Sequence, residues 1–123
     1  MRIFKINLFK CLSIVFVMTF ISIYNYQVYA QKNFVLDADV NFENEKYFTA
    51  IDLYKKGEVK VKDIQEKGRI NFQIAECYRV SVEPEQAQTY YERAIKLKYQ
   101  NDHPEVFLVL SDVFKEQGEY DLA

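Results

Sequence analysis

The chain has 123 residues, a formal net charge of −2 at pH 7, one histidine and two cysteines. This length allows one modest domain, and the near-balanced charge offers no basic patch for nucleic acid or an anionic membrane surface. A single histidine argues against a zinc site, which needs several nitrogen or sulfur ligands at set spacing. With only three glycines, the sequence also has no glycine-rich loop for a phosphate group.

Residues 1–30 have the composition of a secretory signal. They begin with three basic residues and no acid, continue with an uncharged apolar run over 11–23, and close with the small residue Ala30. This order predicts export and cleavage after Ala30. The alternative is an uncleaved anchor in the inner membrane, although a spanning helix needs about 20 predominantly apolar residues.

Removal of that segment would leave residues 31–123 as an acidic domain. This part keeps all 18 acidic residues but loses three of the 16 lysines and arginines. Cys77 would be its only cysteine. No disulfide could then form within it, so we expect the domain to be held together by packing alone.

Residues 31–123 contain an internal repeat. Ala50, Ala87 and Ala123 lie 37 and 36 residues apart, and Tyr54 and Tyr91 each follow their alanine by four residues. Tyr47 and Tyr120 each precede theirs by three. The residues twelve positions before each alanine are also small: Ala38, Ala75 and Ser111. Such a period is typical of two antiparallel helices and their two turns.

Apolar residues recur at helical spacing in three stretches, the last of which follows Pro104, a residue suited to the first turn of a helix. The three apolar faces are Ile70, Ile74, Cys77 and Tyr78, then Ala87, Tyr90, Tyr91, Ala94, Ile95 and Leu97, then Val106, Phe107, Leu110, Val113 and Phe114. Ala75, Ala87 and Ala94 would let neighbouring helices approach closely. No alternating strand pattern competes in residues 31–123, so the sequence predicts an all-α fold.

Three segments resemble the tetratricopeptide repeat, a helix–turn–helix unit of about 34 residues. They are ADVNFENEKYFTAIDLYKKG (38–57), IAECYRVSVEPEQAQTYYERAI (74–95) and LSDVFKEQGEYDLA (110–123). The family prefers glycine at the turn, where this chain has Glu45 and Val82, and tyrosine where it has Pro84. The resemblance implies an α-solenoid of antiparallel helix pairs with about two and a half repeats, at about 34–67, 68–103 and 104–123.

The third repeat is expected to be truncated, because the chain stops at Ala123, where a second helix should pack. We therefore expect the sequence to be a fragment, with a natural short protein as the alternative. On this reading, part of the apolar surface of four residues would face water: Val106, Leu110, Val113 and Phe114.

Residues 72–123 also resemble the amino-terminal repeat region of certain Bacteroidetes envelope proteins. In these, tetratricopeptide repeats precede a WD40-like propeller and an OmpA-like peptidoglycan-binding domain, and they include the PorE-like component of the type IX secretion machinery. The resemblance implies a non-catalytic scaffold of the periplasm or cell envelope that binds a protein or peptide. It also implies association with outer-membrane or peptidoglycan proteins through later domains. An accessory module at the amino terminus of a larger enzyme or signalling protein is the alternative.

In such an array, the first helix of each pair lines a concave groove. The outward residues would be Arg69, Phe72, Glu76 and Arg79, then Glu105, Leu108, Asp112 and Lys115. An exposed Phe72 between two arginines could anchor an apolar side chain or a carboxylate-bearing peptide. Alternatively, Phe72 packs on the preceding helix pair and the arginines pair with Glu76. Phe72 and Glu76 replace the lysine and asparagine of the carboxylate-clamp subfamily, so capture of chaperone C-termini is not expected.

Catalysis, a metal, a cofactor and a small-molecule substrate are not expected. His103 is interpreted as a solvated turn residue, and Cys77 as a buried, inert thiol, because it lies on the apolar face beside Ile74 and Tyr78. The neighbouring acids are interpreted as helix-terminus charges and solvated faces: Asp37, Asp39, Glu43 and Glu45.

Overall fold

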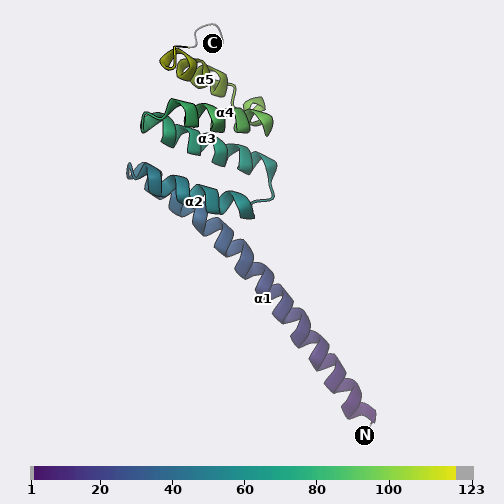
Figure 1. Ribbon diagram of the computed structural model, residues 1–123. Helices are drawn as coiled ribbons and strands as arrows, with labels where there is room; N and C mark the ends of the chain where they lie inside the picture. Colours follow the sequence, from purple (N-terminus) through teal and green to yellow (C-terminus); the bar gives the residue numbers. More distant parts are fainter. Residues whose placement is uncertain (1, 119–123) are drawn as a thin grey trace. The chain divides into compact units, whose positions relative to one another are not determined.

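Every regular element between Arg2 and Gly118 is helical, which confirms the all-α prediction for this part of the chain. The computed structural model describes residues 2–118, with the side chains of residues 7–26 and 34–118. In chain order (Figure 1), the helices are α1 (Arg2–Glu43), α2 (Tyr47–Lys60), α3 (Ile64–Val80), α4 (Pro84–Lys96), the short 3₁₀ helix η1 (Tyr99–Asn101) and α5 (Glu105–Glu116).

The chain divides into two units, Met1–Lys32 and Asn33–Ala123. In the first unit, the 20 residues Asn7–Tyr26 are long and apolar enough to cross a membrane, judged by length and composition. Their large apolar side chains are exposed. A secretory signal and a membrane anchor share these properties.

In the second unit, each helix packs against the next one along the chain. α2 packs on α3, α3 on α4 and α4 on α5. α3 begins after Asp63, whose carboxylate accepts a hydrogen bond from the amide of Glu66 at 3.0 Å, as a residue preceding a helix commonly does. α4 begins with Pro84 at its first position, where the missing backbone N–H costs nothing. The last turns of α1, from Phe34 on, form the first helix pair with α2, and α3 forms the second pair with α4.

Small residues lie where these helices come closest. Ala75, Ala87 and Ala94 are completely buried, as the sequence predicts. Gly57 of α2 lies so near α1 that a Cβ atom there would come within 2.7 Å of Val35 Cγ2. A side chain larger than the hydrogen of glycine would therefore collide with α1 at position 57.

The buried face of α3 also agrees with the helical spacing. Ile70, Ile74 and Cys77 are completely buried, and so are the side chains of Tyr54 from α2 and Tyr91 from α4. The two tyrosines lie 37 residues apart and occupy the same place in the first and second helix pairs. The core thus repeats with the period of the sequence.

The turns repeat with the same period. Glu45 and Val82 have φ angles of 60°, and Gly118 has a φ angle of 76°. All three are in the left-handed region, which favours glycine. They lie 37 and 36 residues apart, as do the aligned alanines. A left-handed residue therefore follows α1, α3 and α5 at equivalent positions, although only the last of the three is glycine.

Backbone hydrogen bonds explain why a left-handed residue is needed there. The amide of Val82 donates to the carbonyl of Arg79 at 3.1 Å, and the amide of Glu83 donates to that of Tyr78 at 2.9 Å. This pair of bonds satisfies the last free carbonyl groups of a helix and requires a left-handed residue between them. The turn after α1 has the equivalent pair, from Glu45 to Phe42 at 3.0 Å and from Lys46 to Asn41 at 2.9 Å.

The expectation about the apolar face of the third repeat is wrong for three residues. Val106, Leu110 and Val113 are buried, because they belong to the same core cluster as Tyr90 and Ala94 of α4. Phe114 is partly buried against this cluster. The large apolar side chains that α5 exposes are instead Phe107 and Leu108. The aligned residues Tyr120 and Ala123, and the second helix expected to contain them, lie outside the described residues.

Candidate protein-binding surface

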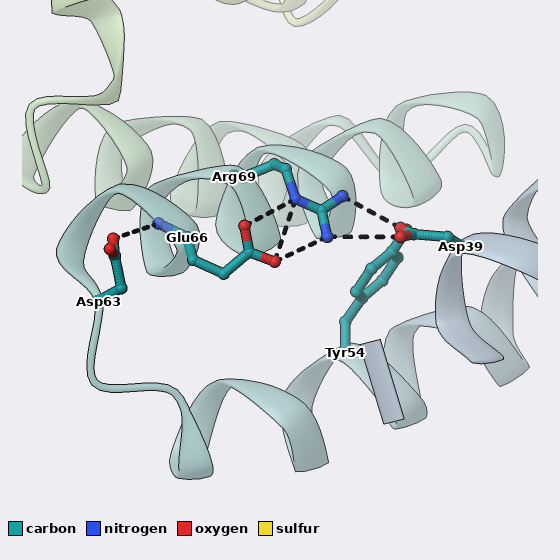
Figure 2. Close-up of polar contacts among 5 residues, drawn as sticks. All are labelled: Asp39, Tyr54, Asp63, Glu66 and Arg69. Carbon is teal, nitrogen blue, oxygen red and sulfur yellow. Dashed lines mark hydrogen bonds and ion pairs between the residues drawn. The ribbon is translucent and has the colours of Figure 1, made fainter. Parts of the chain in front are cut away.

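An ion-pair network joins the first helix pair to α3 (Figure 2). Arg69 of α3 donates from Nη1 to Asp39 Oδ1 at 3.1 Å, and from Nη2 to Glu66 Oε1 at 2.9 Å. The hydroxyl of Tyr54 donates to the same carboxylate oxygen of Asp39. Asp39 is thus held by two donors from two other helices, and Arg69 is held between two carboxylates.

The second helix pair repeats part of this arrangement. Glu76 of α3 accepts a hydrogen bond from the hydroxyl of Tyr91 and pairs with Arg79 Nη2 at 2.6 Å. Its side chain is only 15% exposed. Glu76 lies 37 residues after Asp39, and Tyr91 lies 37 residues after Tyr54. The bond between a tyrosine and an acid fifteen residues earlier is therefore a repeated feature of the structure.

Burial controls the ionisation of these groups. It raises the pKa of Tyr54 and of Tyr91 well above 10.0, and the acceptor carboxylate of each raises it further. The hydrogen bond with Glu66 raises the pKa of Arg69, and the bond with Asp39 adds to it against the effect of burial. Both hydroxyls are therefore neutral donors and the guanidinium stays charged at physiological pH.

Phe72, expected in the groove, is partly buried. Its ring centroid lies 5.7 Å from that of Tyr91 and 5.5 Å from that of Tyr99, distances typical of favourable aromatic pairs. Phe72 thus packs on α4 and η1, which follow α3 in the chain, and not on the preceding pair as the alternative had it. Arg79 pairs with Glu76, as that alternative expected. Arg69 pairs instead with Asp39 and Glu66.

The four expected groove residues of α5 lie at the surface. Leu108 is 71% exposed. Asp112 and Lys115 form an ion pair at 3.1 Å with side chains 68% and 53% exposed, and such exposed pairs contribute little stability. The carboxylate oxygen Oε1 of Glu105 lies 3.0 Å from Nδ1 of His103. The α3 residues of the predicted groove are thus held by contacts with other side chains of the chain, whereas its four α5 residues are exposed.

Cys77 lies in the core, whereas His103 lies in the turn before α5 with its side chain 43% exposed. Burial, and then the nearby charge of Glu76, raise the pKa of Cys77 to about 12, so its thiol is not a nucleophile at neutral pH. The ring of His103 stacks on Tyr99 with centroids 4.2 Å apart. Within residues 2–118, the described His, Cys, Asp and Glu side chains form no group of three or more that could hold a metal ion.

Sequence reasoning missed the bonds of Tyr54 and Tyr91 to their acids. A signal was present, because an acid follows each small residue of the repeat: Asp39, Glu76 and Asp112 follow Ala38, Ala75 and Ser111. Asp39 is expected to be a helix-terminus or solvated charge, because acids on helices usually are, and Glu76 is expected in the groove or paired with the arginines.

No protein-family model matches the chain, and no curated protein matches it either. Support for a function therefore comes from the chain's own residues.

Proposed function

We propose that this chain is a non-catalytic scaffold of the bacterial cell envelope, built from tetratricopeptide-like helix pairs, that binds another protein or a peptide. One observation carries the proposal, namely the periodicity of the structure. Left-handed turn residues at Glu45, Val82 and Gly118 lie 37 and 36 residues apart, and tyrosine–acid bonds recur with the same period.

Repeated helix pairs of this kind form extended arrays in which each pair contacts mainly its neighbours. Such arrays expose long surfaces for recognition. In this chain, α5 provides an exposed apolar side chain beside charged ones, as Leu108, Asp112 and Lys115 illustrate. Exposed apolar groups with polar neighbours are typical of protein-binding surfaces.

The apolar N-terminal helix supports export. Its window Asn7–Tyr26 has the length and composition of a signal or an anchor, and three basic residues without an acid precede the apolar run. We propose cleavage after Ala30, which would release residues 31–123 into the periplasm. Intact-mass analysis of the protein from the bacterium that produces it tests this. A chain that begins at Gln31 supports export with cleavage, and a chain that keeps residues 1–30 contradicts cleavage.

The binding role is tested by photo-crosslinking in the same cells. A photoreactive amino acid at Leu108 should give an adduct with a defined envelope protein. The matched control is Val59 of α2, which is 85% exposed but lies outside the proposed surface. Absence of any adduct from Leu108, or the same adducts from both positions, would contradict a binding role for this surface.

A further inference from the structure

Four side chains from three helices form a cationic and aromatic cluster, which we call the α2–α4 cluster and define as Lys55, Tyr78, Tyr90 and Arg93. Lys55 belongs to α2, Tyr78 to α3, and both Tyr90 and Arg93 to α4. The cluster thus joins the first helix pair to the second. None of its members belongs to the groove that the sequence predicts.

The two tyrosines form the base of the α2–α4 cluster. Their rings are stacked, with centroids 5.6 Å apart and an angle of 27° between the ring planes. Tyr90 is buried and Tyr78 is half-buried, so packing holds both rings in place. Aromatic rings attract cations to their faces, and this pair of rings is fixed before any ligand arrives.

Both cations of the cluster lie close to the ring of Tyr90. Lys55 Nζ is 5.5 Å from the ring centroid, and Arg93 Cζ is 4.7 Å from it. Lys55 Nζ also donates a hydrogen bond to the hydroxyl of Tyr78 at 3.1 Å. Burial lowers the pKa of Lys55, but the bond with Tyr78 and the neighbouring Tyr90 raise the pKa by more. The ammonium group is therefore charged at physiological pH.

Among the side chains of residues 34–118, neither cation of the cluster forms an ion pair with an acid. The ion pairs in this part of the chain involve other basic residues, namely Arg69, Arg79, His103 and Lys115. Arg69 and Arg79 of α3 each hold a carboxylate of the chain, whereas Arg93 lies over an aromatic ring. The α2–α4 cluster therefore carries positive charge that these side chains do not neutralise.

The cluster also keeps hydrogen-bond donors for a ligand. Contact with a ring face occupies none of the N–H groups of a guanidinium, so those of Arg93 can still bind an oxygen. The hydroxyl of Tyr78 accepts a hydrogen bond from Lys55, which leaves its own hydrogen to donate. Two positive charges beside these donors favour an anionic group with oxygen acceptors.

We infer that the α2–α4 cluster binds a carboxylate from an acidic segment of a protein partner. The inference rests on the proposed binding function and adds a second surface to it. Arg93 is the main ligand, because its planar guanidinium can bind both oxygens of a carboxylate. Lys55 supplies further positive charge, and the hydroxyl of Tyr78 donates to the same carboxylate. Such charge complementarity selects acidic segments over neutral ones.

A short acidic peptide is the probe for this site. Hexaglutamate and its uncharged analogue hexaglutamine, each with a neutral fluorescent dye, are titrated with the full chain in mild detergent at low salt. Fluorescence anisotropy should show saturable binding of hexaglutamate only. Added sodium chloride should weaken this binding, because salt screens charges that are exposed to solvent.

Chain variants locate the binding site. Arg93→Gln should weaken the binding of hexaglutamate about tenfold, the loss expected for a hydrogen bond between charged groups. Tyr78→Phe keeps the stacked ring but removes a donor, so it should weaken the binding as well. Lys46→Gln removes the same charge as Arg93→Gln from an exposed residue before α2 and should leave the affinity unchanged. Circular dichroism should show that all three variants stay helical.

Four results would overturn the inference: no saturable binding of hexaglutamate, equal binding of hexaglutamine, equal affinities of the Arg93→Gln and Lys46→Gln chains, or displacement of hexaglutamate by inorganic phosphate at concentrations where acetate has no effect. The last result would assign the cluster to a phosphate ligand. If hexaglutamate fails to bind while Leu108 still crosslinks to an envelope protein in cells, the scaffold function stands and only this second surface is wrong.

Discussion

The hydroxyl of Tyr54 donates a hydrogen bond to the carboxylate of Asp39, fifteen residues earlier, and Tyr91 makes the same bond to Glu76. Each bond joins the two helices of one pair. Both phenol groups have pKa values raised by burial and then by the acceptor acid. The two bonds should therefore persist at every pH at which the chain is folded and its carboxylates are ionised.

Removing one hydroxyl should weaken the second helix pair. Tyr91→Phe keeps the buried ring and leaves Glu76 paired with Arg79, so no buried charge is left without a partner. We expect the free energy of unfolding to fall by about 1.5–3 kcal/mol, the contribution of a hydrogen bond to a charged group. Urea denaturation followed by circular dichroism measures this. Tyr24→Phe, at an exposed residue, is the control, and equal midpoints for the two variants would contradict the prediction.

The raised pKa values of Tyr54 and Tyr91 predict a loss of stability in alkali. In the unfolded chain both phenols ionise near 10.0, whereas in the folded chain they stay protonated. Their contribution is complete below about pH 10 and is lost progressively as the pH rises further. The melting temperature should thus fall as the pH rises above about 10, and less steeply in the Tyr54→Phe/Tyr91→Phe variant. Tyrosinate absorbance that develops fully before unfolding would show the prediction to be wrong.

Val82 should be a site of stabilisation. A left-handed conformation costs a non-glycine residue about 1–2 kcal/mol, and the greater chain entropy of unfolded glycine offsets about 0.5–1 kcal/mol of that. Val82→Gly should therefore raise the free energy of unfolding by about 1 kcal/mol, as urea denaturation can measure. Val59→Gly, at an exposed position within α2, should give no increase. The prediction fails if Val82→Gly is no more stable than the wild type.

Enlarging Ala87 should disrupt the second helix pair. Ala87 is completely buried, and inserting methylene groups into such a site typically costs 1–3 kcal/mol, so we expect about that loss of unfolding free energy for Ala87→Leu. Gln86→Leu changes the adjacent, exposed residue of the same helix and should be nearly neutral. If both variants melt at the same temperature, α4 does not pack on α3 through Ala87.

The thiol of Cys77 should be unreactive in the folded chain. Its pKa of about 12 leaves almost no thiolate at neutral pH, and the side chain is buried. In a Cys11→Ser background, iodoacetamide should label Cys77 only after denaturant is added, as mass spectrometry can show. Gln86→Cys in the same background places a thiol on the surface and should be labelled at once. Rapid labelling of native Cys77 would contradict its burial.

Much of the second unit could be predicted from sequence because the relevant properties are local. Helical spacing identified Ile70, Ile74 and Cys77 as one face, and the size of Ala87 and Ala94 predicted where helices approach. Each of these residues is completely buried. The predictions needed no knowledge of which helix lies opposite.

Contacts between distant residues could not be predicted in this way. Arg69 pairs with Asp39, thirty residues earlier. The repeat distinguishes Asp39 from the exposed Asp37 by its place after Ala38, but nothing in the sequence indicates Arg69 as its donor. The packing of Phe72 on Tyr99 depends on the path of η1, which follows the left-handed residue Lys98. Side chains of this length reach several neighbours, and tertiary geometry decides among them.

The packing of each helix on its successor has a consequence for the rate of folding. The tyrosine–acid hydrogen bonds of the two helix pairs join residues only fifteen apart in the sequence. The ion pair between Arg69 and Asp39 joins residues thirty apart. Short spans mean low contact order, and helical domains of low contact order fold within microseconds to milliseconds, because little loop entropy is lost before contacts form. Either helix pair could act as the nucleus, with the other adding to it. The first helix pair could therefore form before α4 has been synthesised.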